Sequence, residues 1–110
     1  MSTQTSTIEY ITDQLAGVHD ITSRKMFGEY AIYASGKVVA LVCDDTLFVK
    51  ITPEGKVYVG SKYEEGTPYP GAKPWILIDS DLLEDRDWIS ALIKITEENL
   101  PEPNPKKKKR

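Results

Sequence analysis

A chain of 110 residues is long enough for one domain with one hydrophobic core. Its 40% hydrophobic and 28% charged residues are typical of a globular protein, and no apolar run approaches the roughly 20 residues of a membrane-spanning helix. The formal net charge is −3, but five of the 14 basic residues form the C-terminus, so the rest of the chain has 9 basic and 17 acidic residues, or −8. We therefore expect the body of the protein to repel a phosphate backbone.

The cysteine content and the N-terminus both bear on localisation. The single cysteine, Cys43, lies within an apolar run, which excludes a disulfide scaffold and a cysteine-based metal site and favours a reducing compartment. The N-terminal residues MSTQTSTIEY lack the basic start and the apolar core of a signal peptide. We expect a cytoplasmic protein that does not act at a membrane.

The first predicted element is an amphipathic helix over about residues 7–16. Ser6 and Glu9 have the spacing of a capping box, and Gly17 is a natural C-terminal stop. Apolar residues recur at helical spacing, at Ile8, Ile11, Leu15 and Val18. This apolar stripe requires a partner surface.

A three-stranded antiparallel meander is predicted over residues 24–51, which are dense in β-branched and aromatic residues. Two short connections, Ser35-Gly36 and Asp44-Asp45, separate the three runs. Gly28 within the first run indicates a bulge or the close approach of another segment. The middle run, residues 37–43, is almost continuously apolar, which favours a central strand.

The remainder of the chain predicts a short helix, a loop, a strand and a long helix. Thr52-Pro53-Glu54 is a helix start, and the glycine- and proline-rich residues 60–74 predict a long loop. Residues 75–79 predict a short strand that extends the sheet. Acidic residues 81–87 then begin a second long helix that ends at Pro101, and residues 101–110 (PEPNPKKKKR) are predicted to be disordered.

This order of elements predicts an α+β domain with two layers. The antiparallel sheet consists of the three-stranded meander and at least one later strand, and an N-terminal and a C-terminal helix pack on it. The expected organisation is a single domain over residues 1–100, followed by the tail 101–110.

No residue pattern indicates catalysis or a cofactor. His19 has no second metal ligand spaced around it, Cys43 is best explained as a core residue, and Asp44-Asp45 as a turn. A glycine-rich phosphate loop, a G-x-S-x-G motif and a paired cysteine motif are all absent from the sequence. We therefore expect a protein that is not an enzyme and that binds no metal or cofactor.

Two features are nevertheless candidates for binding. The loop region contains interleaved aromatic and basic residues: Lys62, Tyr63, Tyr69, Lys73 and Trp75. These aromatic rings either stack on a partner or, as we favour, fold back over the open face of the sheet. The basic tail, which consists of Lys106, Lys107, Lys108, Lys109 and Arg110, either neutralises up to about five phosphates or only aids solubility.

Several segments resemble the N-terminal domain of the TfoX/Sxy family of bacterial competence regulators. The resemblance is carried by Arg24-Lys25-Met26-Phe27-Gly28, Tyr30, Ile32-Tyr33, Gly36-Lys37 and Leu47-Phe48-Val49-Lys50. The loop of residues 68–74 and the helix of residues 83–100 are similar to those of stand-alone relatives. The resemblance covers about residues 8–100 and implies a bacterial, cytoplasmic protein with a two-layer α+β fold. In full-length relatives it implies coactivation of competence genes with a cAMP-receptor-type regulator, but the C-terminal half of those proteins has no counterpart here. The resemblance brings no catalytic residues.

We therefore predict a non-enzymatic module that binds another protein, such as a transcription regulator. The predicted contact residues lie on the first strand and the loop: Lys25, Met26, Phe27, Tyr30, Lys62, Tyr63, Tyr69, Lys73 and Trp75. The alternative is weak nucleic-acid binding through the basic tail and the 60–75 loop. Homodimer formation is left open by the sequence.

Overall fold

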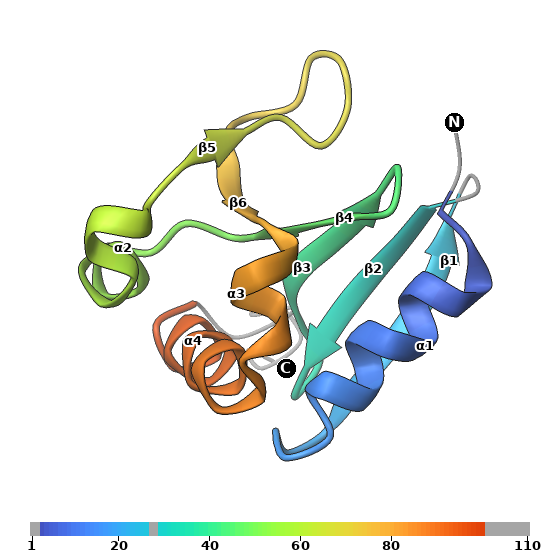
Figure 1. Cartoon of the computed structure of the whole chain (residues 1–110), viewed down its shortest axis with the longest axis horizontal. Coiled ribbons are helices and arrows are strands. Elements are labelled where there is room, and N and C mark those ends of the chain that lie inside the picture. Colours follow the sequence, from blue (N-terminus) through green and yellow to red (C-terminus); the bar gives the residue numbers. More distant parts are fainter. Residues whose placement is uncertain (1–2, 27–28, 101–110) are drawn as a thin grey trace, which may run out of the picture.

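In the computed structural model, which describes residues 3–26 and 29–100, an antiparallel sheet of six strands runs through the molecule. Its spatial order is β1-β2-β3-β4-β6-β5 (Figure 1). The strands are β1 (Ile21–Met26), β2 (Glu29–Ala34), β3 (Lys37–Cys43), β4 (Thr46–Val49), β5 (Glu65–Gly66) and β6 (Trp75–Ile78). The helices are α1 (Thr5–Gln14), α2 (Pro53–Val59), the 3-10 turn η1 (Gly60–Lys62), α3 (Ser80–Glu84) and α4 (Arg86–Glu98). The predicted α+β class is confirmed.

The meander has four strands, where the sequence predicted three. The predicted first run is a hairpin, since β1 begins at Ile21 and pairs with β2 from Ile21–Ala34 to Met26–Glu29. The connection between them, residues 27–28, lies outside the described residues, and so does the predicted bulge at Gly28. A register shift does occur one strand further on, where Ile32 pairs with Ala40 but Tyr33 pairs with Val38.

The two predicted hairpin turns are confirmed. Ser35 and Gly36 have φ angles of 52° and 82°, and Asp44 and Asp45 have φ angles of 52° and 60°. Positive φ at both central residues is typical of the type I′ turn, whose twist matches that of the flanking strands.

Helix α1 begins earlier than predicted, and its predicted capping box is wrong. Its N-cap is Gln4, whose side chain makes no capping hydrogen bond. The Asp45 carboxylate of the β3–β4 turn instead accepts hydrogen bonds from the Gln4 N–H (2.9 Å) and the Thr7 hydroxyl (2.8 Å). Gly17 does not have the left-handed conformation of a C-terminal stop, since its φ is not positive. The apolar stripe is confirmed, since Ile8, Ile11, Leu15 and Val18 are all buried.

The C-terminal region forms two helices where one was predicted. Asp79 caps α3 by accepting from the Leu82 N–H (3.0 Å), and Asp85 caps α4 by accepting from the Trp88 N–H (3.1 Å). The acidic run 79–87 therefore contains two helix starts. The short helix predicted after Thr52 is confirmed as α2, because the Thr52 hydroxyl accepts from the Gly55 N–H (2.9 Å).

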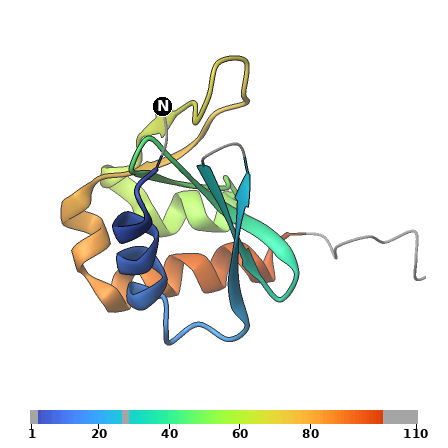
Figure 2. The same cartoon turned by 90° about the vertical axis from the view of Figure 1, so that its right-hand side faces the viewer.

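All four α-helices lie on one side of the sheet, as Figure 2 shows. The core lies between the two layers, and its most deeply buried side chains include Ile11, Leu15, Ile32, Val42, Val49, Ile76, Ile89, Leu92 and Ile93. Across this core, the Gln14 side chain of α1 donates to the Leu83 carbonyl at the end of α3 (2.9 Å). The helices therefore leave the other face of the sheet uncovered.

Candidate functional site

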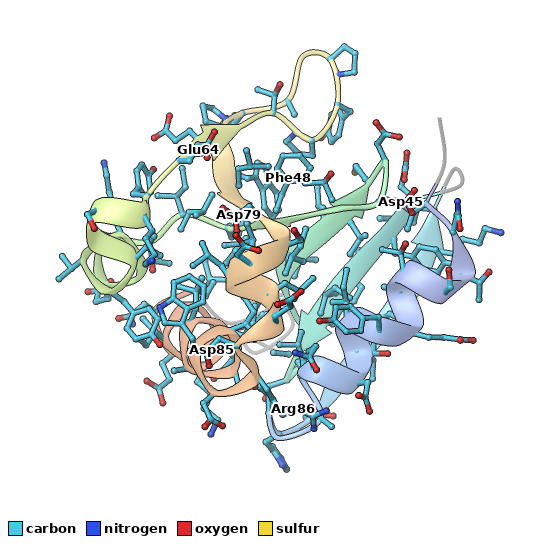
Figure 3. The ribbon with its side chains drawn as sticks, viewed as in Figure 1. Asp45, Phe48, Glu64, Asp79, Asp85 and Arg86 are labelled. Carbon is cyan, nitrogen blue, oxygen red and sulfur yellow. The ribbon has the colours of Figure 1, made fainter. Side chains whose placement is uncertain are left out.

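The face of the sheet opposite the helices, here called the helix-free face, is formed by every second residue of the strands. The pairing register aligns Ala31, Leu41, Phe48 and Leu77 across β2, β3, β4 and β6. None of them belongs to the core beneath the helices. The Phe48 ring (Figure 3) lies against Gly66 of β5, where a Cβ would be only 3.1 Å from its Cε2 atom. Because glycine has no Cβ, position 66 leaves room for the Phe48 ring beside β5.

An apolar groove of about 530 Å³, here called the groove, opens at one end of this face. It is lined by Met26, Glu29, Tyr30, Leu41, Cys43, Pro68 and Tyr69. These residues come from β1, β2, β3 and the loop between β5 and β6. Of the four large hydrophobic residues that are exposed in the described part of the chain, Met26 (40%) and Tyr69 (55%) both line the groove. Exposed apolar side chains that line a concave surface are typical of binding sites.

Two cations lie over aromatic rings elsewhere on the helix-free face. The Arg24 guanidinium lies 5.8 Å from the centre of the Tyr33 ring, and the Lys50 ammonium lies 5.7 Å from the centre of the Trp75 ring. Both distances are within the range of cation–π attraction. The face therefore has an apolar centre with cationic side chains around it.

Comparison with known proteins matches this chain to the family model of the TfoX N-terminal domain over residues 13–100. The match covers most of the chain. The protein belongs to the TfoX N-terminal domain family. It is also 36% identical, over 109 residues, to an uncharacterized 12.7 kDa protein in the trpE 5′ region of Spirochaeta aurantia. That similarity spans 99% of this chain and 93% of the relative. The resemblance seen in the sequence is confirmed.

In this TfoX N-terminal domain, some of the predicted contact residues come together. Met26 and Tyr69 line the groove, and Trp75 lies on the same face beside Lys50. Tyr30 also borders the groove, but it pairs with Lys25 and packs against the core on the helix side. The structure thus joins the first predicted strand to the aromatic loop. We favoured the interpretation that the loop aromatics fold back over the open face of the sheet. Trp75, which is half-buried, fits this interpretation. Tyr69 fits it less well, because its side chain is exposed.

Other predicted residues lie elsewhere. Tyr63 packs against the core, its hydroxyl donates to Glu65 (2.6 Å), and the Lys56 ammonium lies 5.1 Å from its ring centre. Lys62 and Tyr63 line a separate polar cavity of about 360 Å³ beside Glu64 and Asp79, which are labelled in Figure 3. Lys25 alternates with Met26 and so points to the opposite side of the sheet, and Lys73 is exposed. Phe27 and Lys106–Arg110 lie outside the described residues.

Four residues that line the groove were not predicted from the sequence: Glu29, Leu41, Cys43 and Pro68. The geometry of a strand places Leu41 and Cys43 on the same face of β3, but the almost continuously apolar run 37–43 shows no alternation that would mark this face as open. What the sequence could not indicate is which face the helices would leave open.

The groove has little polar chemistry. Burial and the nearby Glu29 carboxylate raise the pKa of the Cys43 thiol to about 11, so the thiol is protonated at neutral pH. Glu29 itself is held by the Thr3 hydroxyl (2.6 Å) and the Asp44 N–H (3.1 Å). Across residues 3–26 and 29–100, the structure contains no group of three or more His, Cys, Asp or Glu residues that could hold a metal ion.

No helix in the same ranges is long and apolar enough to cross a membrane.

Proposed function

We propose that this TfoX N-terminal domain is a non-enzymatic module that binds another protein through the groove. The observation that carries the proposal is the placement of Met26 and Tyr69, two large exposed apolar side chains, on the walls of one apolar cavity. A cavity of this kind suits one or two apolar side chains of a partner, which would be the central anchors of the interface. The rim residue Glu29 is already hydrogen-bonded within the domain.

The regulatory part of the proposal follows from the family. We propose that the partner is a transcription regulator of the bacterial cytoplasm and that this chain is an accessory to it. The Cys43 thiol in the groove is protonated at neutral pH and so is a poor nucleophile, which supports binding over thiol catalysis.

Nucleic-acid binding is the second candidate, carried by the basic tail together with Lys62 and Lys73. The charge of −8 outside the tail disfavours it, since that surface repels phosphates. An electrophoretic shift across a salt series, with and without residues 106–110, tests it. A tail-dependent shift that weakens steeply with salt would support this candidate, and no shift at low salt would remove it.

Site-specific photocrosslinking tests the protein-binding proposal. A photoreactive phenylalanine analogue replaces Tyr69 at the groove or, as a matched control, Val57 of α2, which is an 81% exposed hydrophobic residue on the helix side. In cells we expect crosslinks to one defined regulator from position 69 and none from position 57. Crosslinks that are absent from position 69, or that are equal from both positions, would contradict the proposal.

A further inference from the structure

Strand β1 is an outer strand of the sheet, and its outer edge is accessible. It is the first strand in the spatial order and pairs only with β2 among the described strands (Figure 1). Thr22 to Met26 are all exposed, and only Ile21 is half-buried. An outer strand presents unpaired N–H and C=O groups, with which an extended segment of another chain can pair.

The register identifies which backbone groups face outward. The Ser35 N–H donates to the Asp20 carbonyl (3.1 Å), which makes Asp20–Ser35 a hydrogen-bonded pair in continuation of the β1–β2 register. Hydrogen-bonded and non-hydrogen-bonded pairs alternate in an antiparallel ladder, so Thr22 and Arg24 also bond to β2. The N–H and C=O groups of Ser23 and Lys25 therefore point to the free edge.

Two adjacent cations mark this edge. Arg24 and Lys25 are exposed, lie on opposite faces of the sheet, and form no ion pair within the described residues. A strand added along β1 would place its own side chains next to both. Carboxylates at those positions would complement the two charges, and such cross-strand pairs are stabilising.

The same cations disfavour a second copy of this chain as the added strand. Two β1 strands could pair in antiparallel fashion with Ser23 of one copy opposite Ser23 of the other. The two Arg24 side chains would then be diagonal neighbours on one face. If they paired about Arg24, those side chains would be directly opposite each other, and like charges in that position are destabilising. The edge therefore discriminates against self-pairing.

We propose that β1 binds an extended segment of a partner protein as an additional strand, with carboxylates of that segment facing Arg24 and Lys25. This inference rests on the proposed function, because it specifies the kind of segment that the partner presents. Met26 both ends β1 and lines the groove, so such a segment would lead directly to the groove.

The first test uses a synthetic threonine-rich peptide with two adjacent central glutamates, which place one carboxylate on each face of the added strand. The same peptide with two lysines in place of the glutamates is the control. The full chain is labelled with ¹⁵N and titrated with each peptide. We expect the glutamate peptide to shift the Ser23 and Lys25 amide signals and to slow their exchange with solvent. Thr22 and Arg24 amides, already bonded to β2, should change little, and the lysine peptide should have no effect. Unchanged Ser23 and Lys25 signals at millimolar glutamate peptide would overturn the inference.

Variants test the two recognition elements separately. The double variant R24E/K25E should weaken binding of the glutamate peptide at least about fivefold, whereas Lys94→Glu, at an exposed site on α4, should leave it unchanged. Ser23→Pro removes one outward N–H and should also weaken binding, but Ser23→Ala, which retains that N–H, should not. Equal binding by R24E/K25E and the unmodified chain would refute the proposed role of the cations.

The two proposals fail in different ways. If the Tyr69 crosslinks persist at the same yield in R24E/K25E, the groove proposal stands and the edge-strand inference is wrong. If the Ser23 and Lys25 amides respond to the glutamate peptide while no Tyr69 crosslink forms, the edge binds its segment and the groove proposal is wrong.

Discussion

Lys37 should contribute to stability far more than other lysines of this domain. Its ammonium group donates to the Glu97 carbonyl (2.8 Å) and the Leu100 carbonyl (3.1 Å), lies 3.3 Å from the Glu97 carboxylate, and is part of a side chain that is only 10% exposed. A strand residue thus caps the C-terminus of α4, where carbonyl groups have no partner within the helix and a cation is favoured.

The magnitude of this contribution follows from these contacts. Lys37→Met keeps the unbranched stem but removes both hydrogen bonds. The Leu100 carbonyl loses a charge-assisted bond of about 1.5 kcal/mol, and the Glu97 carbonyl loses less because it also accepts from the Leu100 N–H (3.4 Å). We expect the free energy of unfolding to fall by about 2 kcal/mol, which corresponds to a melting temperature lower by roughly 10 °C in a domain of this size.

Urea denaturation of three variants measures the effect. Lys94→Met, at an exposed position on α4, is the matched control and should change the free energy of unfolding by no more than about 0.5 kcal/mol. Glu97→Gln removes only the ion pair and should cost less than about 1 kcal/mol. A Lys37→Met variant as stable as the control would refute the capping role. A Glu97→Gln variant as unstable as Lys37→Met would show that the ion pair dominates.

Three further predictions concern titratable side chains. Burial and the Glu65 carboxylate raise the pKa of Tyr63 from 10.0 to about 12, so the folded state holds this proton more tightly and stability should fall as the pH rises from 10 to 12. Urea unfolding across that range should show a shallower fall in Tyr63→Phe, and an identical fall would contradict the assignment. The Cys43 thiol, with its pKa of about 11, should react slowly with a disulfide reagent at pH 8 and rapidly in urea; fast reaction of the folded protein would be contrary evidence. The hydrogen bonds from Gln4 and Thr7 lower the pKa of Asp45, so the stability that they add should be lost as the pH falls below 3.8. Asp45→Ala should speed amide exchange at the start of α1 more than Asp44→Ala, which places alanine at a similar positive φ angle, and equal exchange would refute the contact.

Much of the fold could be predicted because local chemistry determines it. The two type I′ turns, the apolar stripe of α1 and the Thr52 cap depend on residues close together in sequence. Strand β1 was missed because Thr22 to Lys25 are polar: an outer strand with both faces exposed has no apolar alternation to detect. The cap of α1 was missed because Asp45 lies 41 residues from Gln4.

The candidate site was only partly predictable for a related reason. Met26 and Tyr30 stand out through the resemblance to the family, and Tyr69 through the aromatic and basic residues of the loop. Leu41 and Cys43, in contrast, belong to an almost continuously apolar run, from which the sequence predicts a strand covered on both faces. Their part in the groove depends on where the helices pack and on the pairing of β5 with β6, which positions the loop that carries Tyr69.

The two ends of the described domain lie at opposite ends of β3. Thr3 contacts Glu29 and the β3–β4 turn near Cys43, whereas Leu100 contacts Lys37 at the start of β3. Seven residues of strand separate them, a span of about 20 Å. A fluorescent protein or a surface tether joined beyond Leu100 would therefore leave the groove unobstructed, whereas the same cargo placed before Thr3 would crowd it.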